Sequence, residues 1–320
     1  MIILSTLGWV LLLLGVLVGM SFLTLFERRT LGLIQYRRGP NKVGLGGLVQ
    51  PFRDALKLLS KQLVWPFLSH YWIYLTIPTI RLIISMLVWL SIPSIFNSTD
   101  FKLRGVFFLC CIGVRVFALL GGGWSSSSRY AYIGALRSVA QSLSYEVCLS
   151  LLLLCLILLV GSLSFELITT TQQECIILIP NITLFILWVP SILAELNRTP
   201  FDFSEGESEL VSGFNIEYRS LMFGAIFIAE YTMIILIRML IVMIFFGGIV
   251  KPLLTILIFY SLFFFIIWVR GRLPRFRYDF LIIVCWKVFL PISLFIIIIS
   301  VRFSTIYVNL NLRGFFKYST

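Results

Sequence analysis

Carboxylates are rare in this chain, and nearly half of them lie in one short stretch. Charged residues make up 12% of the 320 residues, yet six of the fourteen acids fall within residues 195–217. These six are Glu195, Asp202, Glu205, Glu207, Glu209 and Glu217. If the segment is helical, Asp202, Glu205 and Glu209 share a face and repel one another, so that some of them bind protons more readily than an isolated acid does. Such a cluster can take up and release protons near neutral pH.

A water-exposed acidic loop is the simpler interpretation of this stretch. Large apolar residues interleave with the acids, however, and a solvated loop does not need them. They are Phe201, Phe203, Leu210, Val211, Phe214 and Ile216. We therefore expect the segment to be buried against a partner or a cavity.

Two further acids interrupt long apolar runs. Glu230 lies ten residues into the run 220–246, which at ~1.5 Å per residue places it ~15 Å deep, near the bilayer midplane. Glu146 lies about one turn inside the run 142–165. A carboxylate at such a depth costs about 3 kcal/mol, so it requires a partner or a water-filled cavity. Because Arg238 is ~12 Å from Glu230 along the helix axis, the two cannot pair directly, and we predict that Glu230 transfers protons.

Basic residues gather after the first apolar run. The segment PFRDALKLLSK, residues 51–61, has apolar residues at helical spacing and predicts an amphipathic helix at the membrane interface. It can act as a headgroup anchor. Alternatively, Arg28, Arg37 and Asp54 line the mouth of a cavity that a long amphipathic substrate enters from the lipid.

Besides Arg238, further cations interrupt apolar runs, among them Arg81, Arg115 and Lys287. Arg81 and Lys287 are close enough to the end of a run for their side chains to extend to the interface, and we expect both to do so. Arg115 lies deeper, and the sequence assigns it no role.

The composition is that of an integral membrane protein. Hydrophobic residues make up 59% of the chain and its mean hydropathy is +1.02. Continuous apolar runs favour helices over barrel strands, so we expect an all-α polytopic protein with a single membrane domain, residues 1–320. The expected spans are about 2–26, 73–95, 103–123, 142–165, 175–193, 220–246, 252–269 and 280–301. The first has no cleavage site before it and is expected to be retained.

The net charge of +12 reflects how Lys and Arg are distributed between the two sides of the membrane, and it does not indicate a nucleic-acid surface. Sixteen Lys and Arg residues fall in the connections after the first, third, fifth and seventh spans, against six on the other side. The positive-inside rule places the basic side in the cytoplasm or matrix, together with the acidic loop and the amphipathic helix, and both termini opposite.

Residues that could hold a redox cofactor are scarce. His70 is the only histidine, and the six cysteines lack the spacing of zinc or iron-sulfur sites. We therefore expect no metal site and no redox cofactor in this chain, so electrons must come from a partner or a freely bound small molecule.

Five motifs in this order resemble a known family. They are ERRTLGLIQYRRGPNKVG, ALRSVAQSLSYEV, AELNRTPFDFSEGESELVSGFNIEY, AEY at 229–231 and PRFRYD at 274–279. From Leu17 to Pro291 the chain is similar to subunit 1 of NADH-ubiquinone oxidoreductase, respiratory complex I, in its mitochondrially encoded form, and most to arthropod versions.

The resemblance implies a place and a set of partners. It implies eight transmembrane helices in the mitochondrial inner membrane, with the basic and acidic loops in the matrix. Ubiquinone is the implied substrate and enters through a tunnel that this subunit forms. FMN and iron-sulfur clusters are implied in partner subunits. The implied partners are the peripheral-arm subunits of the quinone site, small neighbouring membrane-arm subunits and lipids.

The resemblance also assigns roles to residues. It places the family's tunnel residues at Arg28, Arg37, Arg198, Arg270 and Arg275, and we expect Asp54, Arg137 and Phe201 in their surroundings. It places a chain of acids, which couples quinone reduction to proton translocation, at Glu146, Glu195, Asp202, Glu205, Glu207, Glu209, Glu217 and Glu230, with Tyr145 and Tyr231 beside them. Three residues depart from the family pattern: Leu196 replaces a usual Thr, Arg219 a small residue, and Arg115 an uncharged one.

Other functions share these features. The homologous subunit of a membrane-bound hydrogenase or of a plastid-type dehydrogenase has the same acidic loop with a different electron donor. A buried Glu230 also suits a channel or antiporter that acts alone, and a passive anchor for the peripheral arm would leave the acids free to be neutralised.

Overall fold

A computed structural model describes residues 2–93, 102–172, 176–202, 213–248 and 252–302. Throughout this part of the chain the regular structure is helical. The α-helices are α1 (Ile2–Ile34), α2 (Gln50–Ser60), α3 (Tyr71–Leu87), α4 (Arg104–Ser125), α5 (Arg129–Val160), α6 (Phe165–Thr171), α7 (Ile182–Glu195), α9 (Ser220–Phe246), α10 (Pro252–Arg272) and α11 (Tyr278–Val284). Short 3-10 turns lie at Val88–Ser91 and Gly213–Asn215, and a π-helical turn, Cys285–Phe289, continues α11 toward Arg302.

The expected all-α membrane fold is confirmed. Seven helices of the described chain are long and apolar enough to cross a bilayer, and the shorter apolar helix α7 supplies the remaining expected span. The helix ends differ from the apolar runs, because a hydrophobic run follows the hydrocarbon whereas a helix continues wherever its backbone bonds are satisfied. Thus α1 continues through Glu27 to Ile34, and α5 begins at Arg129. Helix α7 begins only at Ile182, since Pro180 disfavours a helical residue before it.

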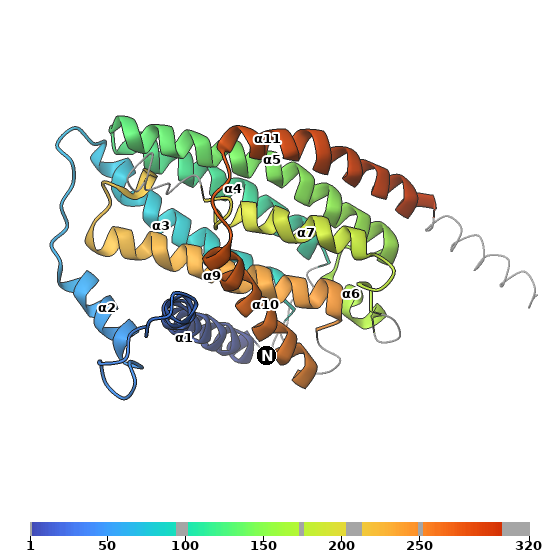
Figure 1. Cartoon of the computed structure of the whole chain (residues 1–320), viewed down its shortest axis with the longest axis horizontal. Coiled ribbons are helices and arrows are strands. Elements are labelled where there is room, and N and C mark those ends of the chain that lie inside the picture. The colour runs from blue at the N-terminus through green and yellow to red at the C-terminus, as the bar shows by residue number, and fades with distance from the viewer. Residues whose placement is uncertain (1, 94–101, 173–175, 203–212, 249–251, 303–320) are drawn as a thin grey trace, which may run out of the picture.

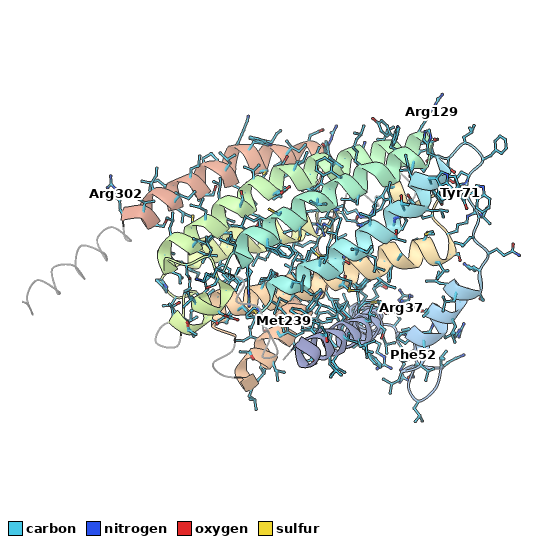
Figure 2. The ribbon with its side chains drawn as sticks, turned by 180° about the vertical axis from the view of Figure 1, so that it is seen from behind. Arg37, Phe52, Tyr71, Arg129, Met239 and Arg302 are labelled. Atoms are coloured by element: carbon cyan, nitrogen blue, oxygen red, sulfur yellow. The ribbon has the colours of Figure 1, made fainter. Side chains whose placement is uncertain are left out.

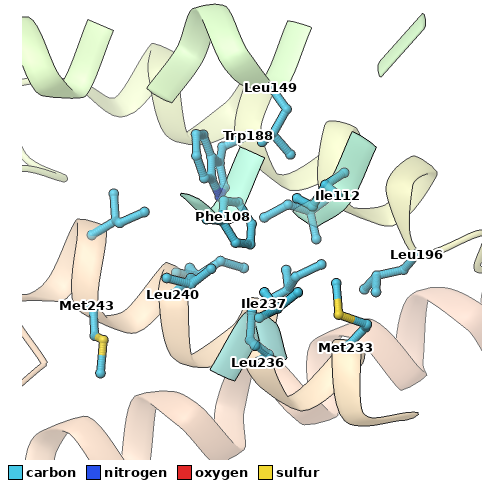
Figure 3. Close-up of a cluster of buried hydrophobic side chains, with 14 of the residues drawn as sticks. Phe108, Ile112, Leu149, Trp188, Leu196, Met233, Leu236, Ile237, Leu240 and Met243 are labelled. Carbon is cyan, nitrogen blue, oxygen red and sulfur yellow. The ribbon is translucent and has the colours of Figure 1, made fainter. Parts of the chain in front are cut away.

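Helix α9 lies in the middle of the molecule, with α3 packed along one side of it and α1 and α10 along another (Figure 1). Its apolar residues from Met233 to Met243 belong to one hydrophobic core cluster with Phe108 and Ile112 of α4, Leu149 of α5 and Trp188 of α7 (Figure 3). Packing on every side explains why a helix that is apolar all round is so deeply buried. An acid on such a helix must face protein and not lipid.

Four connections meet at one end of the bundle, as the charge pattern predicts. Three hydrogen bonds join them: His70 N to Ser125 O at 3.0 Å, Ser220 Oγ to Lys61 O at 2.6 Å, and Phe276 N to Pro200 O at 3.1 Å. Tyr71 and Arg129 mark this end in Figure 2, and Arg302 marks the opposite one. The four basic connections therefore lie on one side of the membrane.

The expected amphipathic helix is α2, which lies at the side of the bundle next to α1 (Figure 1). Pro51 is its only buried residue, while Phe52, Leu56 and Leu59 are exposed. An apolar face left open beside a membrane protein suits the lipid interface.

Candidate functional site

Glu27 is the hub of a buried charged cluster. It lies near the end of α1 and accepts a hydrogen bond from the hydroxyl of Tyr231 on α9, with an O–O distance of 2.7 Å. Arg198, just after α7, donates from 3.3 Å, and Arg270 of α10 also pairs with the carboxylate. One carboxylate thus ties together α1, α9, α10 and the connection that follows α7.

Positive charge is in excess around Glu27. A gap of about 10 Å³ is lined by Glu27 and by three arginines, Arg198, Arg238 and Arg270. The guanidinium of Arg238 lies 4.0 Å above the ring of Phe263, and its Nε and Nη1 have no hydrogen-bond partner among the described residues. With three cations against one carboxylate, the cluster attracts negative charge that forms nearby.

Arg198 connects this cluster to Glu230. Its guanidinium lies 4.7 Å above the ring of Tyr231. Burial opposes its charge, but the neighbouring Tyr231, Glu27 and Glu230 outweigh burial and raise the pKa of Arg198 above its ordinary value. Arg198 therefore stays a cation that both acids attract.

Glu230 has a direct partner that the sequence did not suggest. Arg81 of α3 donates to its carboxylate from 2.9 Å, and the arginine side chain is only 6% exposed. The expectation that Arg81 extends to the interface is therefore wrong, because the buried carboxylate and the ring of Phe214, 4.9 Å away, hold it inside. Arg238 does not pair with Glu230, as the helix geometry predicts.

Tyr74 and Tyr218 continue the polar path toward the connection after α7. Their rings stack with centroids 4.5 Å apart, and the hydroxyl of Tyr74 donates to the backbone oxygen of Glu217 at 2.6 Å. Burial raises the pKa of Tyr218, against the opposing effects of its hydrogen bond with Ser125 and the charge of Arg81. Glu217 itself is half-buried beside this stack.

Glu195 forms a second buried ion pair, with Arg115 of α4. The carboxylate side chain is 0% exposed, and Nη2 of Arg115 donates both to it and to the backbone oxygen of Glu195 at 2.8 Å. Gln141 of α5 donates to the backbone oxygens of Ala194 and Phe201, each at 2.8 Å. These bonds fix the chain after α7 although the residue at position 196 is a leucine, which packs into the apolar core.

Glu146 lies on α5 at the edge of a separate cavity of about 290 Å³. The other lining residues are apolar or glycine, and they come from α4 and α5. Phe117, Leu143 and Val147 nearby are exposed. The cavity therefore opens on the outer surface of this chain.

Asp202 lies at the end of the described range 176–202. It is buried, and its carboxylate lies 3.8 Å from Arg275. Phe201 beside it stacks on Phe276 and lies near Tyr145. Glu205, Glu207 and Glu209, with Phe203, Leu210 and Val211, lie outside the described residues.

The remaining residues of the expected tunnel lie nearer the surface. Arg28 pairs with Asp54 of α2 at 2.6 Å in an exposed ion pair, and Arg37 is exposed at the end of α1 (Figure 2). Arg137 is partly buried on α5, close to Tyr278. The structure thus joins Arg198, Arg270 and Tyr231 in one cluster, but it does not bring Arg28 or Arg37 into it.

An apolar cavity of about 470 Å³ lies between α1, α9 and α10. Phe22, Phe26, Phe259 and Tyr260 line it, among others, and it shares Phe263 with the charged gap around Glu27. Neighbouring Leu14, Val18 and Ile256 are exposed on these helices. The cavity therefore lies beside exposed apolar side chains and adjoins the gap around Glu27.

Sequence reasoning missed Glu27, Arg81 and Arg238. Glu27 ends an uncharged run of 26 residues, which is a signal in itself, but nothing in a single sequence shows that its side chain turns inward. Arg81 and Glu230 are 149 residues apart, so their pairing depends on the packing of α3 against α9. Among the described residues no group of His, Cys, Asp and Glu is suited to a metal ion.

These features define a class: a polytopic helical membrane protein whose lipid-facing apolar cavity adjoins buried, paired carboxylates. A family model for NADH dehydrogenase matches residues 7–301, and the chain belongs to that family.

Curated relatives agree with this assignment. The chain is similar to NADH-ubiquinone oxidoreductase chain 1 of Anopheles gambiae, at 49% identity over 91% of this chain and 93% of the relative. It is also similar to the chain 1 proteins of Locusta migratoria, at 47% over 94% and 97%, and Xenopus laevis, at 45% over 87% and 88%.

Proposed function

We propose that this chain is the subunit of NADH-ubiquinone oxidoreductase, in the mitochondrial inner membrane, through which ubiquinone reaches its reduction site. Its buried carboxylates couple the reduction to proton translocation. The names of its relatives support the complex and the substrate, and with them the expectation that FMN and iron-sulfur clusters reside in partner subunits. The observation that carries the proposal is the Glu27 cluster, because it joins the lipid-facing cavity to the row of buried acids.

The cavity between α1, α9 and α10 suits an isoprenoid tail. Apart from Arg29, its walls are aromatic and aliphatic or glycine, and it lies beside exposed apolar side chains of these helices. A molecule with an apolar tail and a polar head gains from placing the tail on Phe22 and Phe263 and the head toward Arg270 and Glu27. The exposed Arg28–Asp54 pair lies outside this passage, so its role is at the membrane surface.

Reduction supplies the electrostatic signal. A quinone that accepts two electrons must also take two protons to become a neutral quinol, and negative charge appears before the protons arrive. The surplus of arginines around Glu27 attracts that charge, and any nearby acid then binds protons more tightly. Arg198 and Tyr231 contact Glu27 and adjoin Glu230, so they can transmit the change to α9.

The acids form a row of paired sites. Glu230 is paired with Arg81, Glu195 with Arg115 and Asp202 with Arg275, while Glu146 faces a cavity on the outer surface. A proton that neutralises one acid frees its arginine and changes the field at the next. Protons therefore move along the row as the quinone site changes charge.

The test uses the intact complex carrying Glu195→Gln, with Asp279→Asn, which replaces an exposed acid, as the matched control. Electron transfer from NADH to a soluble acceptor should remain at the wild-type level. Ubiquinone reduction and proton translocation should fall together by at least about tenfold. The proposal fails if the variant assembles and pumps like the control. Proton flux by the purified chain alone, without an electron donor, would favour a channel or antiporter instead.

A further inference from the structure

We propose that Arg115 is a positioning residue for the proton pathway: it is the shared counter-ion of Glu195 and Glu146 and sets the pH at which this pair accepts a proton. The inference rests on the proposed function and deepens it. It also gives a role to an arginine that departs from the family pattern.

Arg115 lies deep in the protein, in the middle of α4. It follows the helix start at Arg104 by eleven residues, which is ~16 Å along the axis. Only 7% of its side chain is exposed, and the carboxylate of Glu195 that it contacts is 0% exposed. An isolated charge at this depth would be neutralised or hydrated, so each group requires the other.

The contact with Arg115 orients the Glu195 carboxylate and also balances its negative charge. Nη2 of Arg115 donates both to the carboxylate and, from 2.8 Å, to the backbone oxygen of the same residue. That backbone oxygen belongs to the last turn of α7, whose carbonyls lack helical partners. A single guanidinium therefore fixes both the helix end and the direction of its acid.

Glu146 is the second acid that faces this cation. It projects from α5 against α4 at Gly113, two residues before Arg115: a Cβ atom at Gly113 would lie 2.8 Å from Oε1 of Glu146. Arg115 attracts Glu146, and Glu146 repels Glu195. Arg115 from α4 and Glu146 from α5 are the charged groups that face Glu195 within the described part of the chain.

Two buried atoms of this ion pair are available for proton exchange. Oε2 of Glu195 and Nε of Arg115 have no hydrogen-bond partner among the described residues. A proton that binds Oε2 converts the carboxylate to a neutral acid without breaking an existing hydrogen bond. Glu195 then no longer balances the positive charge of Arg115. That charge instead stabilises the ionised form of Glu146.

The test compares Arg115→Gln with Arg115→Lys in the intact complex, with proton translocation measured as a function of pH. Arg115→Gln removes the cation, so the two acids should hold protons to higher pH and the midpoint should rise by at least about one unit, a tenfold change in proton concentration. Arg115→Lys keeps the charge and should remain within about a third of a unit of the wild type. Infrared difference spectra of oxidised against reduced complex should gain a protonated-carboxyl band only in Arg115→Gln.

Two outcomes overturn the inference while leaving the proposed function intact. One is an unchanged midpoint and spectrum in Arg115→Gln when Glu195→Gln abolishes translocation. The other outcome applies if Arg115→Gln does not assemble. The double variant Arg115→Gln/Glu195→Gln removes both charges, so the inference predicts that it assembles. Absence of that rescue would mean that Arg115 acts through shape alone. Wild-type translocation in Glu195→Gln would instead remove the proposed function itself.

Discussion

Replacing Glu27 by glutamine is the sharpest perturbation of the charged cluster. The amide keeps the size of the side chain but removes the single negative charge that faces Arg198, Arg238 and Arg270. The excess of positive charge then rises from two to three within a nearly closed space. Breaking a buried pair by removing one partner costs about 3–5 kcal/mol. Because an amide oxygen still accepts one hydrogen bond, we expect the lower figure, about 3 kcal/mol, or about a hundredfold in an equilibrium constant.

The effect should be visible in two assays on the purified complex. Thermal dissociation should occur several degrees lower than in the wild type. Ubiquinone reduction should fall at least about tenfold while NADH oxidation by a soluble acceptor is unchanged, since the lost carboxylate orients Tyr231 and Arg270 next to the cavity.

Asp279→Asn provides the matched control. Asp279 also pairs with an arginine, Arg277 at 3.1 Å, but the acid side chain is 66% exposed, so its loss should cost less than about 1 kcal/mol. If Glu27→Gln matched this control in both assays, Glu27 would not be the hub of the site, and the path from cavity to acids would lose its central link.

Three further predictions follow from single contacts. Gly19→Leu places a side chain into the cavity between α1, α9 and α10. A Cβ atom at this position meets only Ile235, at 3.9 Å, so the complex should assemble, with the KM for long-tailed ubiquinone raised about tenfold. An unchanged KM would place the passage elsewhere. Arg81→Gln removes the direct partner of Glu230 and should lower proton translocation at least about tenfold. Normal translocation would show that the pair is not needed. The sulfurs of Cys148 and Cys285 lie 3.4 Å apart, so a mild thiol oxidant should link the two peptides that contain them, as mass spectrometry would detect. Recovery of both cysteines as free thiols would contradict the packing of α5 against the last helix.

Much of the fold could be read from hydrophobicity. Long apolar runs identify membrane helices because the bilayer demands them, and the basic connections correctly identified which loops share a side. Helix ends were less predictable: α1 continues past the apolar run to include Glu27, whose side chain is buried. The place of Glu230, ten residues after the first residue of α9, followed from the apolar run alone.

The pairing of charges could not be predicted in the same way. Arg81 reads as a residue near a helix end, and only the packing of α3 against α9 shows that it meets Glu230. Arg115 had no assigned role because its partner, Glu195, is 80 residues away. A sequence shows that a buried charge must be compensated, but the choice of partner depends on which helices touch.

The most direct test of the account measures ubiquinone reduction and proton translocation together in the intact complex carrying Glu230→Gln. The account predicts that electron transfer to a soluble acceptor persists while ubiquinone reduction and proton translocation are lost together, because the row of acids is interrupted at its deepest member. Wild-type ubiquinone reduction with an unchanged proton-to-electron ratio would show that Glu230 carries no protons, and would contradict the coupling proposed for this chain.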